Sequence, residues 1–371
     1  MKKTADSLQS QDVKREKKSF GRVYTPKTIV DLILDLADYR GSKIVGKHVV
    51  DNSCGDGSFL TEIVERYCRA CSDNLKTNLE TFVHGIEIDE EERQKCLARL
   101  DAIAARYGVS DVRWDVVQAD ATRFDRFDAQ MDYVFGNPPY VRVHNLGASF
   151  DRVKTFEFAR GGMTDLYLVF YEIGLKTLRH GGVLGYITPS SFFNSIAGAP
   201  LRNCLVRDNL LDKLVDLGHY QVFNATTYAT IVVLKKNRKQ ESTEVFEYDG
   251  LLKPIDFLRR DEFFFNDRFF MSSRENLKTL KEIFALGQSG TTFQVKNGFA
   301  TLADSFFIGE SLDFENTIPV VKASTGKWTR CLFPYADGRL IPYGELTRSP
   351  KLAAYYAKNV DRLKKRSLAI P

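Results

Sequence analysis

Long apolar runs are missing from this chain. None approaches the ~20 residues that a membrane-spanning helix needs, although 43% of the 371 residues are hydrophobic. The polar, Lys-rich first 20 residues also lack the apolar centre of a signal peptide. We therefore expect a cytoplasmic protein with a basic flexible arm over 1–20, enough chain for two folded domains, and no membrane contact.

Clustered metal ligands and a strong overall charge are missing too. The six cysteines are scattered, and the one C-x-x-C pair, Cys68 and Cys71, lies in a helical pattern with no second pair at zinc-site spacing. These two are best interpreted as half-buried helix cysteines in a reducing compartment. The net charge is +5, so any surface for nucleic acid must be local.

An alternation of helix and strand patterns is present from about residue 28 to 236. Strands separated by helices of this length predict a mostly parallel sheet with both faces covered. After 239 the alternation is lost, and we interpret 235–244 as a linker to a smaller second domain. The predicted strands are 47–53, 82–88, 111–119, 132–136, 182–188, 210–217 and 228–236, and the predicted helices include 29–37, 59–67, 96–107 and 166–178.

A Pro-rich segment directly follows the strand predicted at 132–136. It reads Asn137, Pro138, Pro139, Tyr140. Two consecutive prolines fix φ and lack an N–H, so the segment forms a rigid shelf rather than a continued strand. The shelf presents two acceptors, the Asn137 amide oxygen and the Pro138 carbonyl, beside the Tyr140 ring. This combination suits an exocyclic amino group on a flat ring, although on four residues alone a structural turn is the better reading.

A glycine-containing turn over 51–57 follows the first predicted strand. Gly55 and Gly57 let the backbone turn tightly and approach a ligand. The turn does not fit G-x-G-x-x-G, which disfavours a pyrophosphate cofactor. Asp51 also disfavours a pyrophosphate cofactor, because a carboxylate repels phosphate and attracts an ammonium group.

Carboxylates also end the next two predicted strands. Glu87 is placed to hold both hydroxyls of a ribose, and Asp120 is placed to accept from an adenine amino group. Each carboxylate alone is commonly a helix cap or a surface charge. Their joint placement at successive strand ends favours S-adenosylmethionine, which carries an ammonium group, a ribose and an adenine but no phosphate.

With these residues together, the chain resembles the gamma-class, TaqI-like adenine-specific DNA methyltransferases of restriction–modification systems. The likeness runs over 21–236 and includes three further segments, 21–26, 183–194 and 222–231. It departs from the family at Asn52, Ser53 and Asn224, where the family more often has Pro, Ala and Pro.

The resemblance implies an α/β fold, that of class I S-adenosylmethionine-dependent methyltransferases, Rossmann-like with a mostly parallel seven-stranded sheet and a smaller C-terminal domain. It implies a methyltransferase catalytic domain over 21–240 and an incomplete DNA target-recognition domain over 245–371. The implied catalytic residues are Asn137, Pro138, Tyr140 and Phe223, with Phe223 and Tyr140 stacking on either side of the base. The implied cofactor-binding residues are Thr25, Asp51, Asn52, Ser53, Cys54, Gly55, Gly57, Glu87, Ile88, Asp120 and Pro139.

The implied reaction transfers a methyl group from S-adenosylmethionine to the amino group of an adenine flipped out of the duplex. The expected partner is double-stranded DNA in the bacterial cytoplasm, with a cognate restriction endonuclease as a further candidate and no metal requirement. A cationic loop at 141–163 is a candidate for closing over the DNA or for a solvated surface loop, on about equal grounds. No D…E-x-K nuclease set is found, so cleavage is not predicted.

Two other readings stay open. The same shelf could accept the planar amide of a protein glutamine or a base in RNA, because each offers an NH₂ group. The segments at Thr25 and Phe223 and the large C-terminal region favour DNA. A non-catalytic DNA-specificity module is the other class, and cofactor titration would distinguish it.

Overall fold

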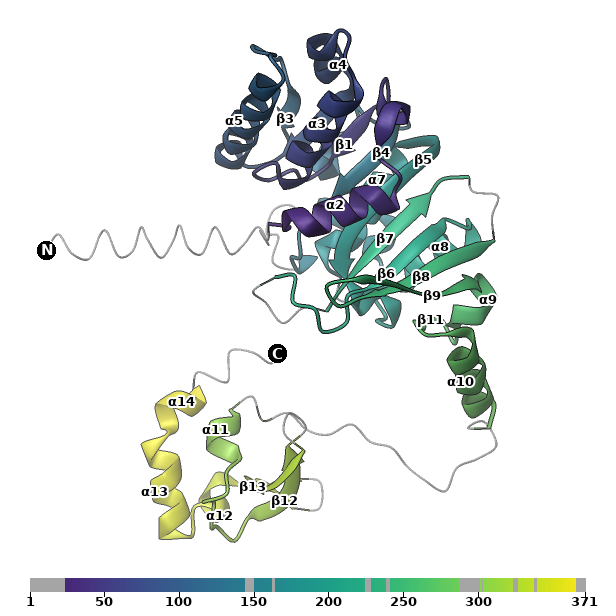
Figure 1. Cartoon of the computed structure of the whole chain (residues 1–371). Helices are drawn as coiled ribbons and strands as arrows, with labels where there is room; N and C mark the ends of the chain where they lie inside the picture. Colours follow the sequence, from purple (N-terminus) through teal and green to yellow (C-terminus); the bar gives the residue numbers. More distant parts are fainter. Residues whose placement is uncertain are drawn as a thin grey trace, which may run out of the picture. The chain divides into compact units, whose positions relative to one another are not determined.

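The computed structural model describes residues 24–143, 150–161, 164–223, 228–237, 241–286, 301, 303–322, 326–336 and 339–364. They fall in two compact units, residues 1–289 and 290–371 (Figure 1). The predicted arm over 1–20 and parts of the cationic loop lie outside the described residues. No helix among those described is long and apolar enough to cross a membrane.

The first unit is built on one nine-stranded sheet with the order β3-β2-β1-β4-β5-β7-β6-β8-β9. Strands β1 to β5 pair in parallel, and β7 runs antiparallel between β5 and β6. The mostly parallel α/β sheet is therefore confirmed. The strands are β1 (Val49–Asp51), β2 (Val83–Glu87), β3 (Asp115–Gln118), β4 (Met131–Gly136), β5 (Leu178–Pro189), β6 (Leu211–Asp216), β7 (Ala229–Lys235), β8 (Ser242–Tyr248) and β9 (Leu252–Arg259).

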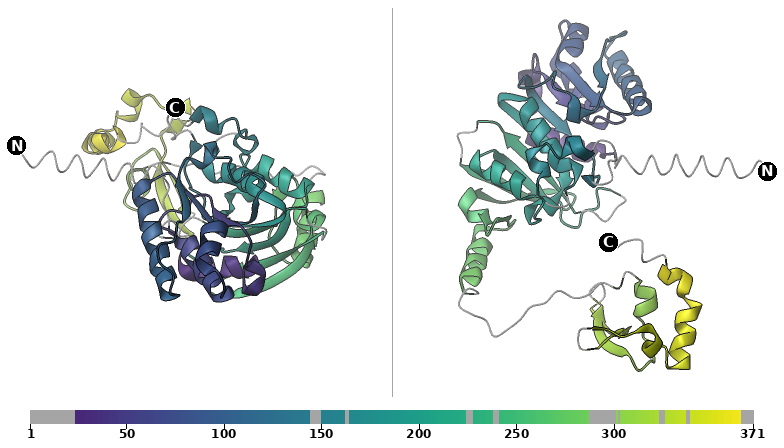
Figure 2. Two further views of the ribbon diagram at one scale, coloured as in Figure 1. Left: turned by 90° about the horizontal axis from the view of Figure 1, so that it is seen from above. Right: turned by 180° about the vertical axis from the view of Figure 1, so that it is seen from behind.

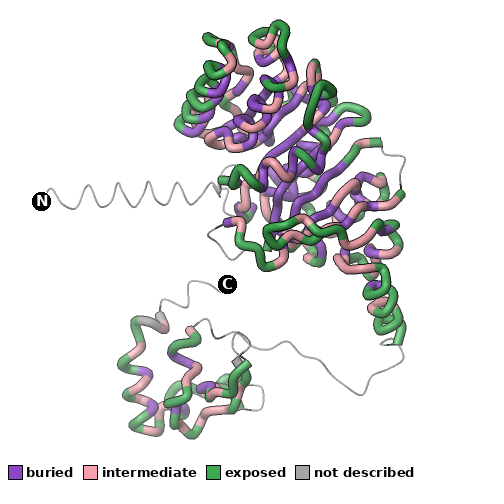
Figure 3. The backbone as a smooth tube through the Cα atoms, in the orientation of Figure 1, coloured by how far each residue is buried: buried purple, intermediate pink, exposed green. Residues whose placement is uncertain are grey.

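Helices cover both faces of this sheet (Figure 2). Successive strand residues pack on opposite faces: Val134 of β4 joins the core under α7 and α8, whereas Phe135 joins the core under α2, α3 and α5. Figure 3 shows the central strands as buried. The helices are α2 (Lys27–Leu36), α3 (Ser58–Ala70), α4 (Leu75–Phe82), α5 (Glu90–Arg106), α6 (Phe150–Val153), α7 (Leu166–Thr177), α8 (Ala199–Arg207), α9 (Arg260–Phe263) and α10 (Arg274–Leu286).

The expected domain boundary between 240 and 245 does not divide the two compact units. Strand β8 pairs in parallel with β6, and β9 pairs with β8, so both extend the sheet beyond the seven strands predicted. Their composition hid them, because β9 is an edge strand with Pro254 and several exposed residues, a pattern that also suits a linker. The Phe-rich stretch that follows, including the hairpin β10 (Phe264–Phe265) and β11 (Arg268–Phe269), also packs on the first unit's core.

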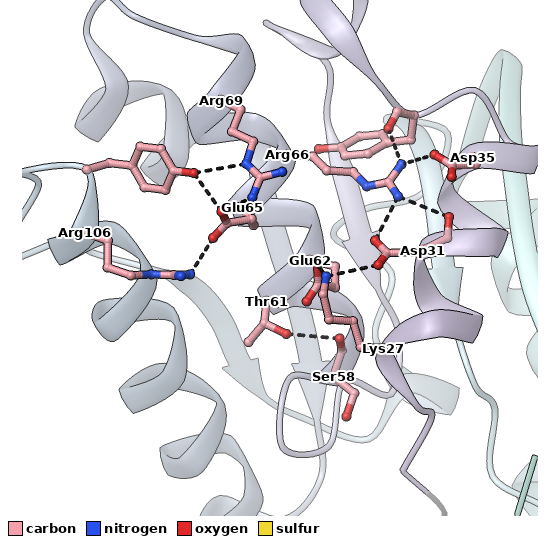
Figure 4. A network of polar contacts seen from close by, with 12 residues as sticks. Lys27, Asp31, Asp35, Ser58, Thr61, Glu62, Glu65, Arg66, Arg69 and Arg106 are labelled. Atoms are coloured by element: carbon pink, nitrogen blue, oxygen red, sulfur yellow. Dashed lines mark hydrogen bonds and ion pairs between the residues drawn. The ribbon is translucent and has the colours of Figure 1, made fainter.

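A polar network joins three helices on one side of the sheet (Figure 4). Arg66 of α3 donates to Asp31 and Asp35 of α2, at 2.9 and 2.7 Å. On the same helix Glu65 accepts from Tyr107, which caps α5, at 2.7 Å and pairs with Arg106. The network fixes α2 and α5 against α3, and α2 begins just after Thr25, a predicted cofactor contact.

The second unit has a small core of its own. Phe306 and Leu332 are fully buried in it, and the hairpin β12–β13 packs beside them. Its elements are α11 (Asp304–Phe307), β12 (Thr317–Lys322), β13 (Lys327–Leu332), β14 (Tyr335–Ala336), β15 (Arg339–Leu340), α12 (Tyr343–Leu346), α13 (Pro350–Lys358) and α14 (Val360–Lys364).

Arg202 of α8 is a charged residue in the centre of the first unit. It is 2% exposed, and one guanidinium nitrogen donates to the Phe192 and Ser195 carbonyls at 2.6 and 2.7 Å. The other terminal nitrogen donates to Asp267 at 3.2 Å. Arg202 therefore links three parts of the first unit: the segment that follows β5, helix α8 and the β10–β11 hairpin.

We expect Arg202→Met to lower the free energy of unfolding by about 2–4 kcal/mol, because two buried carbonyls lose a charged donor. Urea unfolding of the full chain measures this. The matched control is Arg207→Met on the same helix, where the exposed Arg207 pairs with its neighbour Asp208 and no measurable change is expected. Equal effects of the two substitutions would contradict the assigned role.

Candidate functional site

The site lies where parallel strands β1, β2, β3 and β4 end side by side. Asp51 ends β1, Glu87 ends β2, and Asn137 directly follows β4. Strand β1 has β2 on one side and β4 on the other, so the strand order reverses at β1. Open α/β sheets bind ligands at such a topological switch point. The structure thus brings together the three segments that the sequence singled out.

The glycine turn is folded onto the end of β2. The Gly55 N–H donates to Glu87 Oε2 at 2.8 Å, and the Cys54 N–H donates to the Ile86 carbonyl at 3.0 Å. Gly57 has φ +86°, and a Cβ there would lie 2.7 Å from Cys96 Sγ on α5. Glycine is therefore required at 57 by both conformation and space.

Glu87 serves the turn as an acceptor. Its second oxygen accepts from the Asp89 N–H at 2.9 Å, and the residue is 8% exposed. Both carboxylate oxygens of Glu87 therefore face the backbone around the end of β2. Ile88, next to it, is 49% exposed and gives the site an apolar surface.

Asp51 is the most perturbed carboxyl group of the site. It is 2% exposed, and its Oδ1 accepts from the Ser53 N–H at 3.0 Å. Burial raises the pKa of Asp51 to about 8, and the negative charges of Glu87 and Asp56 contribute in the same direction. Among the described residues no cation forms an ion pair with it. A buried carboxyl without a cation favours a positively charged ligand group.

Asp51 also touches the start of the Pro-rich segment. A Cβ at Gly136 would lie 2.7 Å from Asp51 Oδ1, so only glycine fits at this position. Gly136 directly precedes Asn137, whose side-chain oxygen is buried from solvent, and Pro138 is buried as well. The acidic pocket and the two acceptors are therefore neighbours at one sheet edge.

Tyr140 is held in place from two sides. Its hydroxyl donates to the Ile187 carbonyl of β5 at 3.2 Å, and its ring meets Tyr167 of α7 edge-on at 6.2 Å between centroids. Burial, together with the nearby Tyr167, raises the pKa of the Tyr140 hydroxyl, which therefore stays protonated as a donor. Pro139, between Pro138 and Tyr140, is half-buried.

The rings of Tyr140 and Phe223, between which a base is expected to stack, are not parallel in this structure. The two rings are in contact, with centroids 6.1 Å apart and planes at 75°. A base between two parallel rings needs about 7 Å, twice the contact distance of carbon atoms. Phe223 is buried and immediately precedes 224–227, which lie outside the described residues. The sequence thus predicted the pairing of these residues but not the relative orientation of their rings.

The remaining predicted site residues differ in the groups that they offer to a ligand. Thr25 is 6% exposed, and its hydroxyl has no hydrogen-bond partner among the described residues, as expected of a ligand contact. Asn52 is buried, and Ser53 is half-buried. Cys54 is buried, and its thiol faces Cys96, whose hydrogen bond, together with burial, raises the pKa of Cys54 well above its usual range. The Cys54 thiol therefore stays protonated, and the backbone N–H of Cys54 is already committed to the Ile86 carbonyl.

Asp120 caps a short helical turn. Its Oδ1 accepts from both the backbone N–H and the hydroxyl of Thr122, at 2.9 and 2.7 Å. Oδ2 lies 3.6 Å from Arg123. Its position after β3 agrees with the prediction, but one oxygen is already committed to the cap.

Comparisons with known proteins bear on this site. Residues 57–223 match the family model described as Eco57I restriction-modification methylase. Residues 57–223, which we call the methylase domain, are therefore similar to restriction–modification methylases. The predicted kinship with methyltransferases of restriction–modification systems is thereby confirmed, and the matched range begins at the second glycine of the turn and ends at Phe223.

Curated relatives of the methylase domain are type II enzymes. The type II methyltransferase M.BstVI of Geobacillus stearothermophilus is 28% identical over 94% of this chain and 72% of its own length. M.XhoI of Xanthomonas vasicola is 29% identical over 58% of this chain and 42% of its own length. The restriction enzyme and methyltransferase RM.Eco57I of Escherichia coli is 29% identical over 52% of this chain and only 21% of its own length. The chain thus spans less than half the length of two of these three relatives.

Solved structures share the fold. The type IIL restriction-modification enzyme MmeI in complex with DNA has a TM-score of 0.57 at 13% identity, covering 98% of this chain and 54% of that one. The type IIG restriction endonuclease BpuSI has a TM-score of 0.51 at 14% identity, covering 93% and 47%.

Sequence reasoning missed the tyrosine layer behind the methylase domain's Pro-rich segment. The Tyr167 hydroxyl lies 3.1 Å from Ser191 Oγ, and the Tyr171 hydroxyl lies 2.9 Å from Thr188 Oγ1. These pairs fix α7 to the end of β5, against which Tyr140 rests. The apolar periodicity of α7 predicted its burial, but no local signal marks a tyrosine whose partner is about 20 residues away.

The buried carboxyl of Asp51 predicts a pH dependence of stability. Asp51 holds a proton in the native state up to about pH 8, whereas an unfolded Asp ionises near pH 4. Since the native state binds more protons in this window, this contribution makes the free energy of unfolding fall as pH rises from about 4 to about 8.

We expect Asp51→Asn to remove that contribution. The stability of the variant relative to the wild type should rise with pH, by up to a few kcal/mol at about pH 8. Denaturant unfolding of the ligand-free chain across this range measures it, with the exposed Asp73→Asn as control. A stability difference that does not change with pH would contradict the buried, protonated state.

Proposed function

We propose that the protein is an adenine-specific DNA methyltransferase that uses S-adenosylmethionine and acts as the modification component of a restriction–modification system. The observation that carries the proposal is the contact between Asp51 and Gly136. It joins a buried carboxyl suited to a cationic ligand group to a pair of hydrogen-bond acceptors suited to an amino group. The family of the methylase domain supports the same conclusion.

The residues present fit this cofactor. Asp51 would pair with the ammonium group, the Glu87 carboxylate would accept from ribose hydroxyls, and Ile88 would cover one face of the adenine ring. The buried Thr25 hydroxyl without a described partner would gain one. Pairing with the ammonium group favours ionised Asp51, so the proton it holds near neutral pH would be released on binding.

When bound, S-adenosylmethionine supplies an electrophilic methyl group on a sulfonium centre. The chain's part is to make the amino nitrogen of the target nucleophilic. Asn137 Oδ1 and the Pro138 carbonyl would accept its two N–H bonds, which draws the nitrogen toward tetrahedral geometry and frees its lone pair. Held in this way, the nitrogen would take the methyl group, and the electron pair of the carbon–sulfur bond would stay on sulfur. The same two acceptors stabilise the positive charge until a proton leaves the nitrogen.

The target base must leave the helix stack to reach these acceptors, at a cost of a few kcal/mol. The Tyr140 ring, fixed through its hydroxyl to β5, offers a rigid face for stacking. Because Phe223 lies against that ring, entry of a base requires Phe223 to move aside. The Tyr140 side of the base-binding site is therefore already in place, whereas the Phe223 side forms only when the base binds.

The first test incubates the full chain with labelled S-adenosylmethionine and unmethylated duplex DNA and identifies the methylated nucleoside by mass spectrometry. N6-methyladenine is the expected product. Parallel incubations with RNA and with a glutamine-containing peptide cover the other planar NH₂ groups. Methylation of either in place of DNA, or cofactor binding with no transfer to any substrate, would overturn the proposed reaction.

Asn137→Ala should lower the rate of methyl transfer about 10²- to 10³-fold, because one of the two groups that stabilise the developing charge is lost. The affinity for S-adenosylmethionine should be unchanged, as measured by calorimetric titration. Asn276→Ala, on the exposed helix α10, is the matched control and should keep the full rate. Wild-type transfer by Asn137→Ala would remove Asn137 from the mechanism.

Tyr140→Ala should lower kcat/KM for DNA about 5- to 150-fold, as expected for the loss of ~1–3 kcal/mol of stacking on one base. Tyr140→Phe keeps the ring and loses only the hydrogen bond to Ile187, so its effect should be smaller. Both variants should bind the cofactor normally. If Tyr140→Ala abolished cofactor binding instead, Tyr140 would be part of the cofactor site and not the base platform.

A further inference from the structure

The positive charge of this protein is concentrated in its second unit. Residues 290–371 contain 12 Lys and Arg against 7 Asp and Glu, a net charge of +5. The whole chain also carries +5, so residues 1–289 are neutral overall. A small, basic unit attached to a neutral one is the charge distribution expected where an anionic polymer binds.

The hairpin of β12 and β13 has two different faces (Figure 1). On one face Ile318, Val320 and Cys331 pack against the core of the second unit. On the other face Val321 pairs in register with Trp328, and Pro319 pairs with Arg330. These four residues, which we call the outer ribbon face, are exposed, whereas Leu332 further along the same side is buried in the core.

Trp328 is the most unusual member of the outer ribbon face. Its side chain is 71% exposed, and its registered partner Val321 is 50% exposed. A large aromatic residue beside an exposed aliphatic one usually marks an interaction surface rather than a plain solvent face. Cations flank it, with exposed Lys327 next in sequence and Arg330 53% exposed and 3.5 Å from Asp313.

We propose that the outer ribbon face lies in the major groove of duplex DNA, with Trp328 and Val321 against base edges. This inference rests on the proposed function in taking DNA as the partner. Two strands lie about 5 Å apart, and a major groove about 12 Å wide admits a two-stranded ribbon. Arg330, on the same face, then meets a phosphate that borders the groove. The apolar pair contacts thymine methyl groups and contributes to the choice of sequence.

The chain offers a direct reporter of this contact, because it contains only two tryptophans. The other, Trp114, lies in the first unit and donates to Asp101 at 2.7 Å. In Trp114→Phe the fluorescence comes from Trp328 alone. Addition of a pool of short random-sequence duplexes should shift and quench this emission and should protect Trp328 from a soluble quencher.

Affinity for the same duplex pool is measured by anisotropy at several salt concentrations. Trp328→Ala should bind about tenfold more weakly, as for a residue at the centre of an interface, with the salt dependence unchanged. Arg330→Ala should reduce the salt slope by about one. Tyr343→Ala, another exposed aromatic of the second unit, outside the hairpin and 64% exposed, is the matched control and should bind as the wild type.

Unchanged Trp328 emission on saturation with duplex, or wild-type affinity of Trp328→Ala, would overturn the proposal. So would a change in oligomeric state on Trp328→Ala by sedimentation, since the face would then join two copies of the chain. Methyl transfer and cofactor binding are assayed on the same Trp114→Phe preparation. Transfer to DNA without a Trp328 response refutes the ribbon contact alone, whereas a Trp328 response without transfer refutes the proposed reaction alone.

Discussion

The absence of a side chain at Gly136 is the constraint on which the site depends. Strands β1 and β4 are neighbours, and a Cβ at position 136 would lie 2.7 Å from Asp51 Oδ1 and would displace the Asp51 carboxyl group. Glycine lets a buried carboxyl and a rigid Pro-rich segment share one edge of the sheet. The buried carboxyl and the two acceptors that the proposed methyl transfer needs are thereby neighbours.

The scaffold around this contact is built to keep polar groups fixed. The glycine turn is tied to Glu87 by a backbone N–H, α2 and α5 are tied to α3 through Arg66 and Glu65, and the Tyr140 hydroxyl is tied to β5. Such restraints reduce the reorganisation that binding and charge development would otherwise require. Phe223 is the exception, because its ring fills the space that a flipped base would need.

Much of this organisation could be predicted from the sequence. Period-two and period-3.6 patterns predicted the seven strands of the central sheet, and the motifs placed Asp51, Glu87 and Asn137 at adjoining strand ends, where the structure has them. The extra strands β8 and β9 were not predictable, since one-sided burial and Pro254 give them the composition of a linker. Other features depend on contacts that no local sequence pattern reports. They are the ring orientation at Phe223, the hydrogen bonds of Asp120 to Thr122, and the buried hydrogen bonds of Arg202.

Strand β9, which the sequence composition did not reveal, forms one edge of the sheet. An open edge presents unpaired N–H and C=O groups that can recruit a strand from another molecule. Here the last strand, β9, carries Pro254, which supplies no donor, and charged residues at Lys253, Asp256 and Arg259; a register shift at Val245 and Phe246 also distorts its pairing with β8. The sheet can therefore be two strands wider than its central seven without offering a template for aggregation.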